Sequence, residues 1–142
     1  MSLEENKVII RRIFEEGVNK RNLAVMDELL IANYVHHDPA LPPEMQGSRE
    51  AYKQMVSVFV TAFPDLVITI EDVIAEGDKA VCRWAWRGTH QAELMGIPPT
   101  GKQVTSSAIS IYRIAGGKIA EAWVNFDALG MMQQLGVVPP PG

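Results

Sequence analysis

Histidine and acidic side chains are the residues of this chain best suited to chemistry. His36, His37 and Asp38 form one short run, His90 ends a strand-like stretch, and Asp127 precedes a helix-like segment. Imidazole and carboxylate groups are the usual general acids and bases of enzymes. An extended backbone places His36 and Asp38 on one side and His37 on the other. These residue types therefore favour proton transfer as the candidate chemistry.

Each candidate also has a structural interpretation. Asp127 stands where it can cap the last helix, whose free N–H groups favour a carboxylate. His36 suits either the rim of a pocket or a structural hydrogen bond, and His90 suits either a pocket mouth or such a bond. A metal site is not expected, because His-His-Asp in one extended run does not converge on one ion. The single cysteine, Cys82, is expected to be a buried structural thiol.

The elements that must position these residues follow from hydrophobic periodicity. An amphipathic helix is predicted over residues 3–19, with Ser2 and Glu5 at capping-box spacing. A second short helix follows Asn22, and a third runs from Ser48 until Pro64 stops it. After Pro64 the period changes to two, and a last short helix follows. The predicted strands cover residues 66–75, 79–90, 103–114 and 118–126, and the predicted last helix covers residues 128–135.

The composition indicates one globular domain of 142 residues, with 47% hydrophobic and 21% charged residues and a net charge of −4. No Lys/Arg cluster is present, so a nucleic-acid surface is not expected. No apolar run reaches the ~18 residues of a membrane span, and the acidic start does not read as a signal peptide, so a cytoplasmic protein is expected. Residues 1–3 are also compatible with a cloning remnant, and residues 137–142 with a tail.

Three segments together carry a resemblance to a known family. On their order and spacing the chain resembles the SnoaL-like polyketide cyclases of the nuclear-transport-factor-two-like superfamily, over about residues 5–136. The resemblance implies an α+β fold, a cone-shaped barrel whose curved antiparallel sheet wraps over three N-terminal helices around an apolar pocket. It also implies a homodimer through the outer face of the sheet. The segments are Asn33-Tyr34-Val35-His36-His37-Asp38-Pro39, Phe63-Pro64-Asp65-Leu66, and the stretch from Gly88-Thr89-His90 to Gln134-Leu135-Gly136.

The resemblance also implies a reaction. Cyclases of this family close the last ring of an aromatic polyketide by intramolecular aldol condensation, without metal or cofactor. The family's acid/base aspartate falls at Val124, and its helper histidine and glutamine fall at Ser110 and Ala108. A valine cannot move a proton, so Asp127, His36 or His90 would have to replace that carboxylate.

The residues expected to line the pocket follow from strand alternation. They are Ala108, Ser110, Tyr112, Val124, Phe126 and Trp86. Trp84 and Trp86 share one strand face, which favours a core, a dimer interface or a pocket wall. Tyr112 can donate a hydrogen bond to a carbonyl, as superfamily isomerases do, or pack in the core. Arg83 and Arg87 share the opposite face, where cross-strand ion pairs are usual.

Two functions stay open on the sequence. The first is a cofactor-free enzyme, which is cyclase-like or isomerase-like, or hydrolase-like if Arg83 and Arg87 join an aspartate as in the superfamily's epoxide hydrolases. The second is a binding protein that keeps the pocket after losing the catalytic carboxylate at Val124. The enzyme predicts a small apolar, carbonyl-bearing substrate and the binding protein a small-molecule ligand, and neither predicts a metal or another cofactor.

Overall fold

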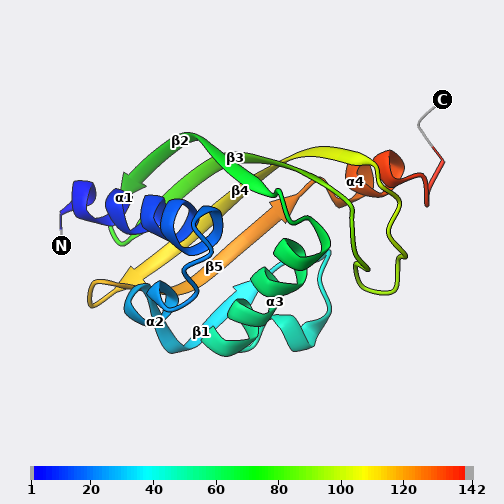
Figure 1. The fold of residues 1–142 in the computed structure, drawn as a ribbon. Coiled ribbons are helices and arrows are strands. Elements are labelled where there is room, and N and C mark those ends of the chain that lie inside the picture. The colour runs from blue at the N-terminus through cyan, green and yellow to red at the C-terminus, as the bar shows by residue number, and fades with distance from the viewer. Residues whose placement is uncertain (1, 140–142) are drawn as a thin grey trace.

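A curved five-stranded sheet with its helices gathered on one face forms the molecule (Figure 1). The computed structural model describes residues 2–139, so residues 140–142 of the predicted tail lie outside the described residues. The α+β fold expected from the sequence is confirmed. The elements, in chain order, are α1 (Leu3–Arg12), η1 (Ile13–Asn19), α2 (Val25–Leu29), β1 (Leu30–His37), η2 (Pro43–Met45), α3 (Arg49–Ala62), β2 (Val67–Glu76), β3 (Lys79–Thr89), β4 (Gln103–Ala115), β5 (Lys118–Phe126) and α4 (Ala128–Leu135).

The sheet is mixed rather than wholly antiparallel, which corrects the sequence prediction. Its strand order is β1-β5-β4-β3-β2, and every neighbouring pair is antiparallel except β1 and β5, which run parallel. Strand β1 was expected only as an extended segment. Its partner lies more than 80 residues further along the chain, as the His36–Ala122 pairing shows. Local periodicity does not encode such a distant parallel register.

The first helix changes its hydrogen-bonding pattern halfway. The predicted capping box forms at its start, where Glu5 N–H donates to Ser2 Oγ at 3.1 Å. From Ile13 the helix continues as the π-helix η1, a rare form that is frequent at functional sites. Gly17 in η1 lets α2 approach, because a Cβ there would lie 2.6 Å from Met26 Cε.

Two polar side chains fasten the end of η1 to the start of β2. Asn19 exchanges two hydrogen bonds with the Ile68 backbone, at 2.9 and 2.8 Å. Arg21 has a left-handed backbone with φ of 59°, which is unfavourable for a residue with a Cβ. Its guanidinium donates to the carbonyl oxygens of Val18, Pro64 and Leu66 at 2.7–2.9 Å. These bonds offset the backbone strain and hold η1 against the sheet.

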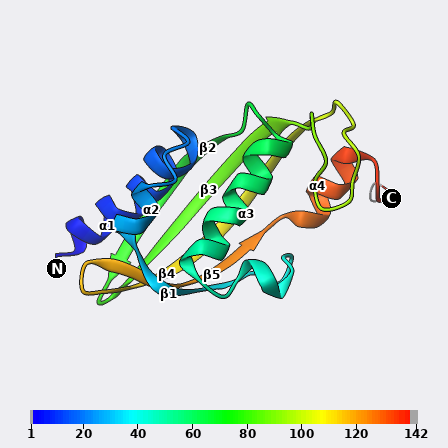
Figure 2. The same ribbon diagram turned by 60° about the horizontal axis from the view of Figure 1, so that its bottom comes forward.

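Helices α3 and α4 cover two further parts of the sheet. Ser48 caps α3 as predicted, accepting from Ala51 N–H at 3.0 Å, and α3 crosses the same face of the sheet as α1 and α2 (Figure 2). Helix α4 follows directly after the end of β5. The Gln134 side chain there accepts from Thr105 N–H at 2.9 Å and donates to Thr105 O at 2.8 Å, as a paired strand would. Among residues 2–139, no helix is both long and apolar enough for a membrane crossing.

The Arg21 contacts generate a stability prediction. Arg21→Ala keeps the left-handed strain and loses the three carbonyl contacts, so we expect it to lower the free energy of unfolding by about 2 kcal/mol. Arg21→Gly loses the same contacts but relieves the strain, so it should recover about 1 kcal/mol of that loss. Urea unfolding followed by circular dichroism measures both. Because alanine keeps the strain, an alanine variant as stable as the wild type would show that the guanidinium contacts contribute nothing.

Candidate functional site

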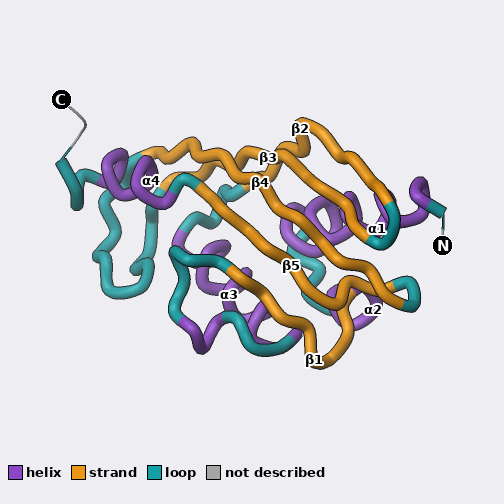
Figure 3. Tube along the Cα trace, turned by 180° about the vertical axis from the view of Figure 1, so that it is seen from behind, coloured by secondary structure: helices purple, strands orange, loops and turns teal. Residues whose placement is uncertain are grey.

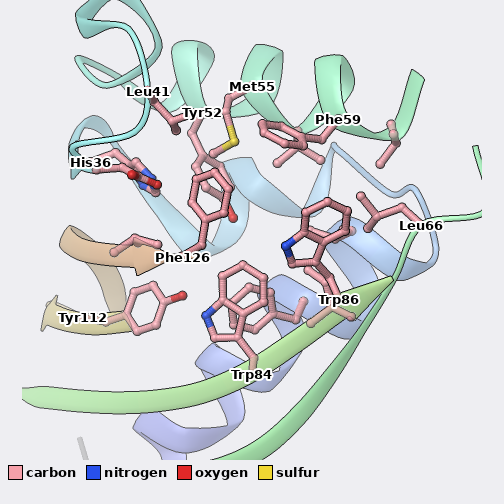
Figure 4. Close-up of a pocket in the computed structure, with 17 residues that line it drawn as sticks. His36, Leu41, Tyr52, Met55, Phe59, Leu66, Trp84, Trp86, Tyr112 and Phe126 are labelled. Atoms are coloured by element: carbon pink, nitrogen blue, oxygen red, sulfur yellow. The ribbon is translucent and has the colours of Figure 1, made fainter. Parts of the chain in front are cut away.

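A small cavity lies between α3 and the inner face of the sheet (Figure 4). Its volume is about 90 Å³, and most of its wall is apolar. The π-helix contributes Phe14 and Val18, which lie four residues apart. Aromatic rings from five elements meet around the space, and these are Phe14, Tyr52, Phe59, Trp84, Trp86, Tyr112 and Phe126.

The aromatic rings of the wall fix one another in place. Phe59 contacts Trp86 and Phe126 edge to face, each at a centroid distance of 6.3 Å. Phe14 packs on Trp84 at 4.9 Å. Such pairs stabilise one another beyond their buried area. The cavity is therefore bounded by rigid, flat surfaces, which suit an apolar or aromatic ligand.

The residues that the sequence predicted for the pocket divide into two groups. Tyr112, Val124, Phe126 and Trp86 line the cavity. Ala108 and Ser110 also face inward, but they are buried beneath the wall rather than part of it. Ser110 Oγ accepts a hydrogen bond from Trp84 Nε1 at 2.8 Å, and Ala108 is the register partner of Trp84. The three positions where the resemblance implies catalytic groups, Val124, Ser110 and Ala108, thus hold packing residues here.

Asp127 and His90 lie away from the cavity wall. The Asp127 carboxylate caps α4, with Oδ1 accepting from Gly130 N–H at 2.8 Å. His90 is fully buried against Phe63, and its Nδ1 accepts from Thr100 N–H at 3.2 Å. His90 thereby holds together the two ends of the loop over residues 91–101. Both residues adopt the structural alternative that the sequence left open.

The arginines of β3 also point away from the cavity. Arg83 and Arg87 are exposed on the outer face, whereas Trp84 and Trp86 face inward. Neither arginine forms an ion pair with any of residues 2–139, although Asp72 is the register partner of Arg83. The cavity wall therefore lacks the arginine–aspartate arrangement considered for an epoxide hydrolase.

His36 lines the cavity and is 4% exposed. Its Nδ1 lies 2.7 Å from the Tyr34 hydroxyl, and its ring packs against Tyr52 at 5.5 Å. Burial lowers the pKa of His36 to about 4, because a charged imidazole loses its hydration there. His36 is therefore neutral at pH 7. Its Nε2 is buried and has no hydrogen-bond partner among the described residues.

Asp38 is the second polar residue of the wall, a position that the sequence did not predict for it. Asp38 is 4% exposed, and its Oδ1 accepts a hydrogen bond from Ala40 N–H at 2.9 Å. Burial raises the pKa of the Asp38 carboxyl above its ordinary value. The signal was present in the alternation along β1, which puts Tyr34, His36 and Asp38 on one side. The sequence alone did not indicate that this side of the segment is buried.

The loop after β1 is fastened so that Asp38 keeps its position. Gln46 Oε1 accepts from Asp38 N–H at 2.9 Å, and Gln46 Nε2 donates to the carbonyl oxygens of Asp38 and Leu41 at 2.8 and 2.7 Å. His36 N–H donates to Gln46 O at 2.9 Å. The side chain of Gln46 therefore holds the backbone at Asp38, and the main-chain carbonyl of Gln46 holds the backbone at His36.

Within residues 2–139, His, Cys, Asp and Glu form no group of three that could hold a metal ion.

Comparison with known proteins relates this geometry to one family. Residues 8–135 match the SnoaL-like polyketide cyclase family. Aklanonic acid methyl ester cyclase DnrD of Streptomyces peucetius is 30% identical over 114 residues, which cover 75% of this chain and 77% of DnrD. TsrD of Streptomyces laurentii superposes with a TM-score of 0.86 at 26% identity, covering 97% of this chain and 99% of TsrD. IdmH of Streptomyces antibioticus, a proposed polyketide cyclase, gives 0.79 at 32% identity, covering 92% and 97%.

The lowered pKa of His36 generates a prediction about stability and pH. Between pH 4 and 6.5, His36 is protonated in the unfolded chain but neutral in the folded chain. The free energy of unfolding therefore decreases as pH falls through this range. At pH 5 the loss attributable to His36 should be about 2 kcal/mol. His36→Asn retains an acceptor for Tyr34 but does not titrate, so its unfolding free energy should fall less between pH 7 and 5. Parallel pH profiles for the two proteins would contradict this account.

Proposed function

Because the chain belongs to the SnoaL-like polyketide cyclase family, we propose that it is a cofactor-free enzyme that moves protons within a small apolar, carbonyl-bearing molecule. The observation that carries the proposal is Asp38, a buried carboxyl group in the wall of an aromatic cavity. A carboxyl whose pKa is raised by burial can take a proton from carbon and later return one. Asp38 thereby replaces the carboxylate missing at Val124.

The reaction that suits this arrangement is an intramolecular aldol condensation. The Asp38 carboxylate removes a proton alpha to one carbonyl and becomes a carboxylic acid, and the substrate becomes an enolate. The enolate carbon then attacks a second carbonyl of the same molecule, forming the ring bond and an alkoxide. Asp38 returns its proton to that alkoxide, so the carboxylate is regenerated and no cofactor is consumed. The similarity to DnrD, which is named as a cyclase, supports ring closure as the outcome.

The size of the cavity limits what can enter without movement. Small-molecule pockets usually measure roughly 300–1,000 Å³, and a cavity of about 150 Å³ holds one benzene ring. A volume of about 90 Å³ is smaller than that, so even a fragment of one ring enters only if the wall moves slightly. A larger substrate requires α3 or the loop bearing Leu41 to move outward. A monocyclic ketone is accordingly the first probe to use.

A second function is supported by a different observation. The positions that carry the family's acid/base groups hold Val124, Ser110 and Ala108, which cannot repeat that chemistry. A protein that only binds its ligand would keep the aromatic wall and need no proton acceptor. The two functions differ in one measurable property, which is whether a bound ketone loses alpha protons.

The enzyme proposal predicts exchange of carbon-bound protons. With cyclohexanone in D2O, the wild-type protein should accelerate alpha-hydrogen exchange above the buffer rate, as followed by NMR. Asp38→Asn retains the acceptor for Ala40 N–H but cannot take a proton, so the enzymatic rate should fall about a hundredfold or more. Asp127→Asn is the matched control, because asparagine also caps helices well and this site lies off the cavity.

The same experiment separates the two functions. Cyclohexanone that binds, as shown by shifts of the indole N–H signals of Trp84 and Trp86, yet exchanges at the buffer rate would support the binding protein. Loss of exchange in Asp127→Asn rather than in Asp38→Asn would move the acid/base role to Asp127.

We further propose that two copies of the chain pair through the outer face of the sheet. This is the face turned away from α1, α2 and α3, and it is toward the viewer in Figure 3. Large apolar side chains remain exposed there. Ile74 of β2 is 58% exposed and Ile109 of β4 is 53% exposed, and Ile111 and Val35 lie on the same face. Ile74 and Ile111 lie in one row across the sheet, on either side of Val81, and an exposed apolar row of this kind marks an interaction site. The resemblance to family members makes a second copy the expected partner.

The dimer proposal predicts a mass. Light scattering should give twice the 15.7 kDa of the chain, and the double variant Ile109→Glu, Ile111→Glu should give the monomer mass, because two carboxylates would be buried opposite their copies. Leu129→Glu, on an exposed position of α4, is the control and should remain dimeric. A monomeric wild-type protein would refute the proposal.

A further inference from the structure

We infer that His36 presents a neutral Nε2–H to the cavity as the hydrogen-bond donor for the oxygen of a bound carbonyl group, and that Tyr34 holds it in this tautomer. The inference rests on the proposed function, since it names the group that receives the substrate's oxygen. It assigns His36 a contact with the ligand and Tyr34 a positioning role. It starts from the buried Nε2 atom that no described residue satisfies.

The tautomer follows from counting hydrogen-bond partners. Tyr34 is 1% exposed, and its hydroxyl contacts His36 Nδ1 at 2.7 Å and no other partner among residues 2–139. If the hydroxyl donates, Nδ1 accepts, the ring proton resides on Nε2, and only Nε2–H lacks a partner. If Nδ1–H donates instead, both the hydroxyl proton and the Nε2 lone pair lack partners. Each buried unsatisfied group destabilises the protein, so the first arrangement is favoured.

The unsatisfied atom belongs to a ring that cannot turn to find another partner. The His36 ring packs against Tyr34 at 5.9 Å and Tyr52 at 5.5 Å, and these two rings contact each other at 5.5 Å. Its Nδ1 is engaged by Tyr34. Buried polar groups are almost always hydrogen-bonded in native proteins, so an exception calls for an explanation. His90 Nε2 is also unsatisfied but lies away from the cavity, whereas His36 belongs to the cavity wall, where a ligand can supply the missing acceptor.

The position of this donor fits the chemistry of the second polar group. His36 and Asp38 lie two residues apart on the inward side of the β1 segment, and both line the cavity. A ketone whose oxygen accepts from Nε2–H would therefore present an alpha carbon on the same side of the cavity as Asp38. As Asp38 removes the proton, negative charge develops on that oxygen. A fixed donor in a water-poor site stabilises the charge without rearranging.

A neutral imidazole is suited to this role. Burial, which keeps the pKa of His36 far below neutral pH, prevents the ring from charging before the substrate arrives. The neutral ring keeps one proton, which the Tyr34 contact places on Nε2, and that N–H serves as the hydrogen-bond donor. A charged imidazolium beside Asp38 would instead form an ion pair and favour the ionised carboxylate, lowering its pKa.

The tautomer can be read without any substrate. In protein labelled with 15N-histidine, long-range 1H–15N spectra should show the His36 signals of an unprotonated Nδ1 and a protonated Nε2, with His37→Gln and His90→Gln variants used for assignment. Tyr34→Phe removes the donor to Nδ1 and should shift the signals toward a mixture of tautomers. Tyr52→Phe is the matched control, because it removes a neighbouring hydroxyl that does not bond to His36. A wild-type ring protonated on Nδ1 would overturn the inference.

Binding of two isosteric probes tests the role of Nε2–H. Cyclohexanone and methylenecyclohexane differ by an oxygen in place of a methylene group, and the Trp84 and Trp86 indole signals report occupancy. The wild-type protein should prefer the ketone, and His36→Asn should reduce the preference about tenfold, which is the size of one hydrogen bond. An unchanged preference in His36→Asn would remove His36 from the oxygen site.

The failure of this inference and that of the proposed function are distinguishable. Ketone preference and the tautomer are equilibrium properties, whereas the proposed function requires exchange of alpha protons. A wild-type protein with the Nε2–H tautomer and a ketone preference but no exchange would keep the oxygen site and reject the enzyme. Exchange that depends on Asp38 without any preference lost in His36→Asn would keep the enzyme and reject the oxygen site.

Discussion

The register of β1 beside β5 is the constraint on which the rest of the site depends. Side chains alternate along a strand, so a shift of one residue would turn Tyr34, His36 and Asp38 to the outer face. The register is fastened from outside, where His37 Nε2 lies 2.6 Å from Glu121 Oε2 and its ring stacks on Trp123 at 5.4 Å. His37, which does not line the cavity, therefore helps to fix the register that turns the neighbouring His36 inward.

One physical cause gives the two polar groups of the cavity complementary properties. Burial among aromatic rings disfavours charge on either group, so it lowers the pKa of His36 and raises that of Asp38. An acid and a hydrogen-bond donor can then coexist without forming an ion pair. The family resemblance implies a carboxylate at the position of Val124, on the inner strand β5. Here the polar groups lie at the edge of the sheet instead, His36 on β1 and Asp38 directly after it, and Val124 is part of the wall.

Local patterns in the sequence predicted most elements, and the family resemblance predicted their assembly. The caps at Ser2 and Ser48, four strands and the last helix followed from side-chain spacing. The parallel β1–β5 pairing did not, since it joins segments far apart in the sequence, and neither did the π-helix. Within the site, His36 and four residues of the wall were among the predicted residues, but Asp38 was not, because it differs from other aspartates only in its burial. Asp127 allowed both a cap and an acid, with the cap favoured, and the structure places it at the N-terminus of α4.

Gln46 fastens the loop after β1 through backbone atoms alone, since its side chain contacts the amide of Asp38 and the carbonyl oxygens of Asp38 and Leu41. Hydrogen bonds to the backbone do not depend on which side chains the loop carries. Residues between Asp38 and Gln46 can therefore diverge, and Leu41 can be exchanged for a smaller or larger residue, while the carboxylate stays in place. This separates the selection of ligands from the proton transfer that we propose for Asp38. It makes the loop the natural segment to randomise when a new ligand specificity is to be evolved.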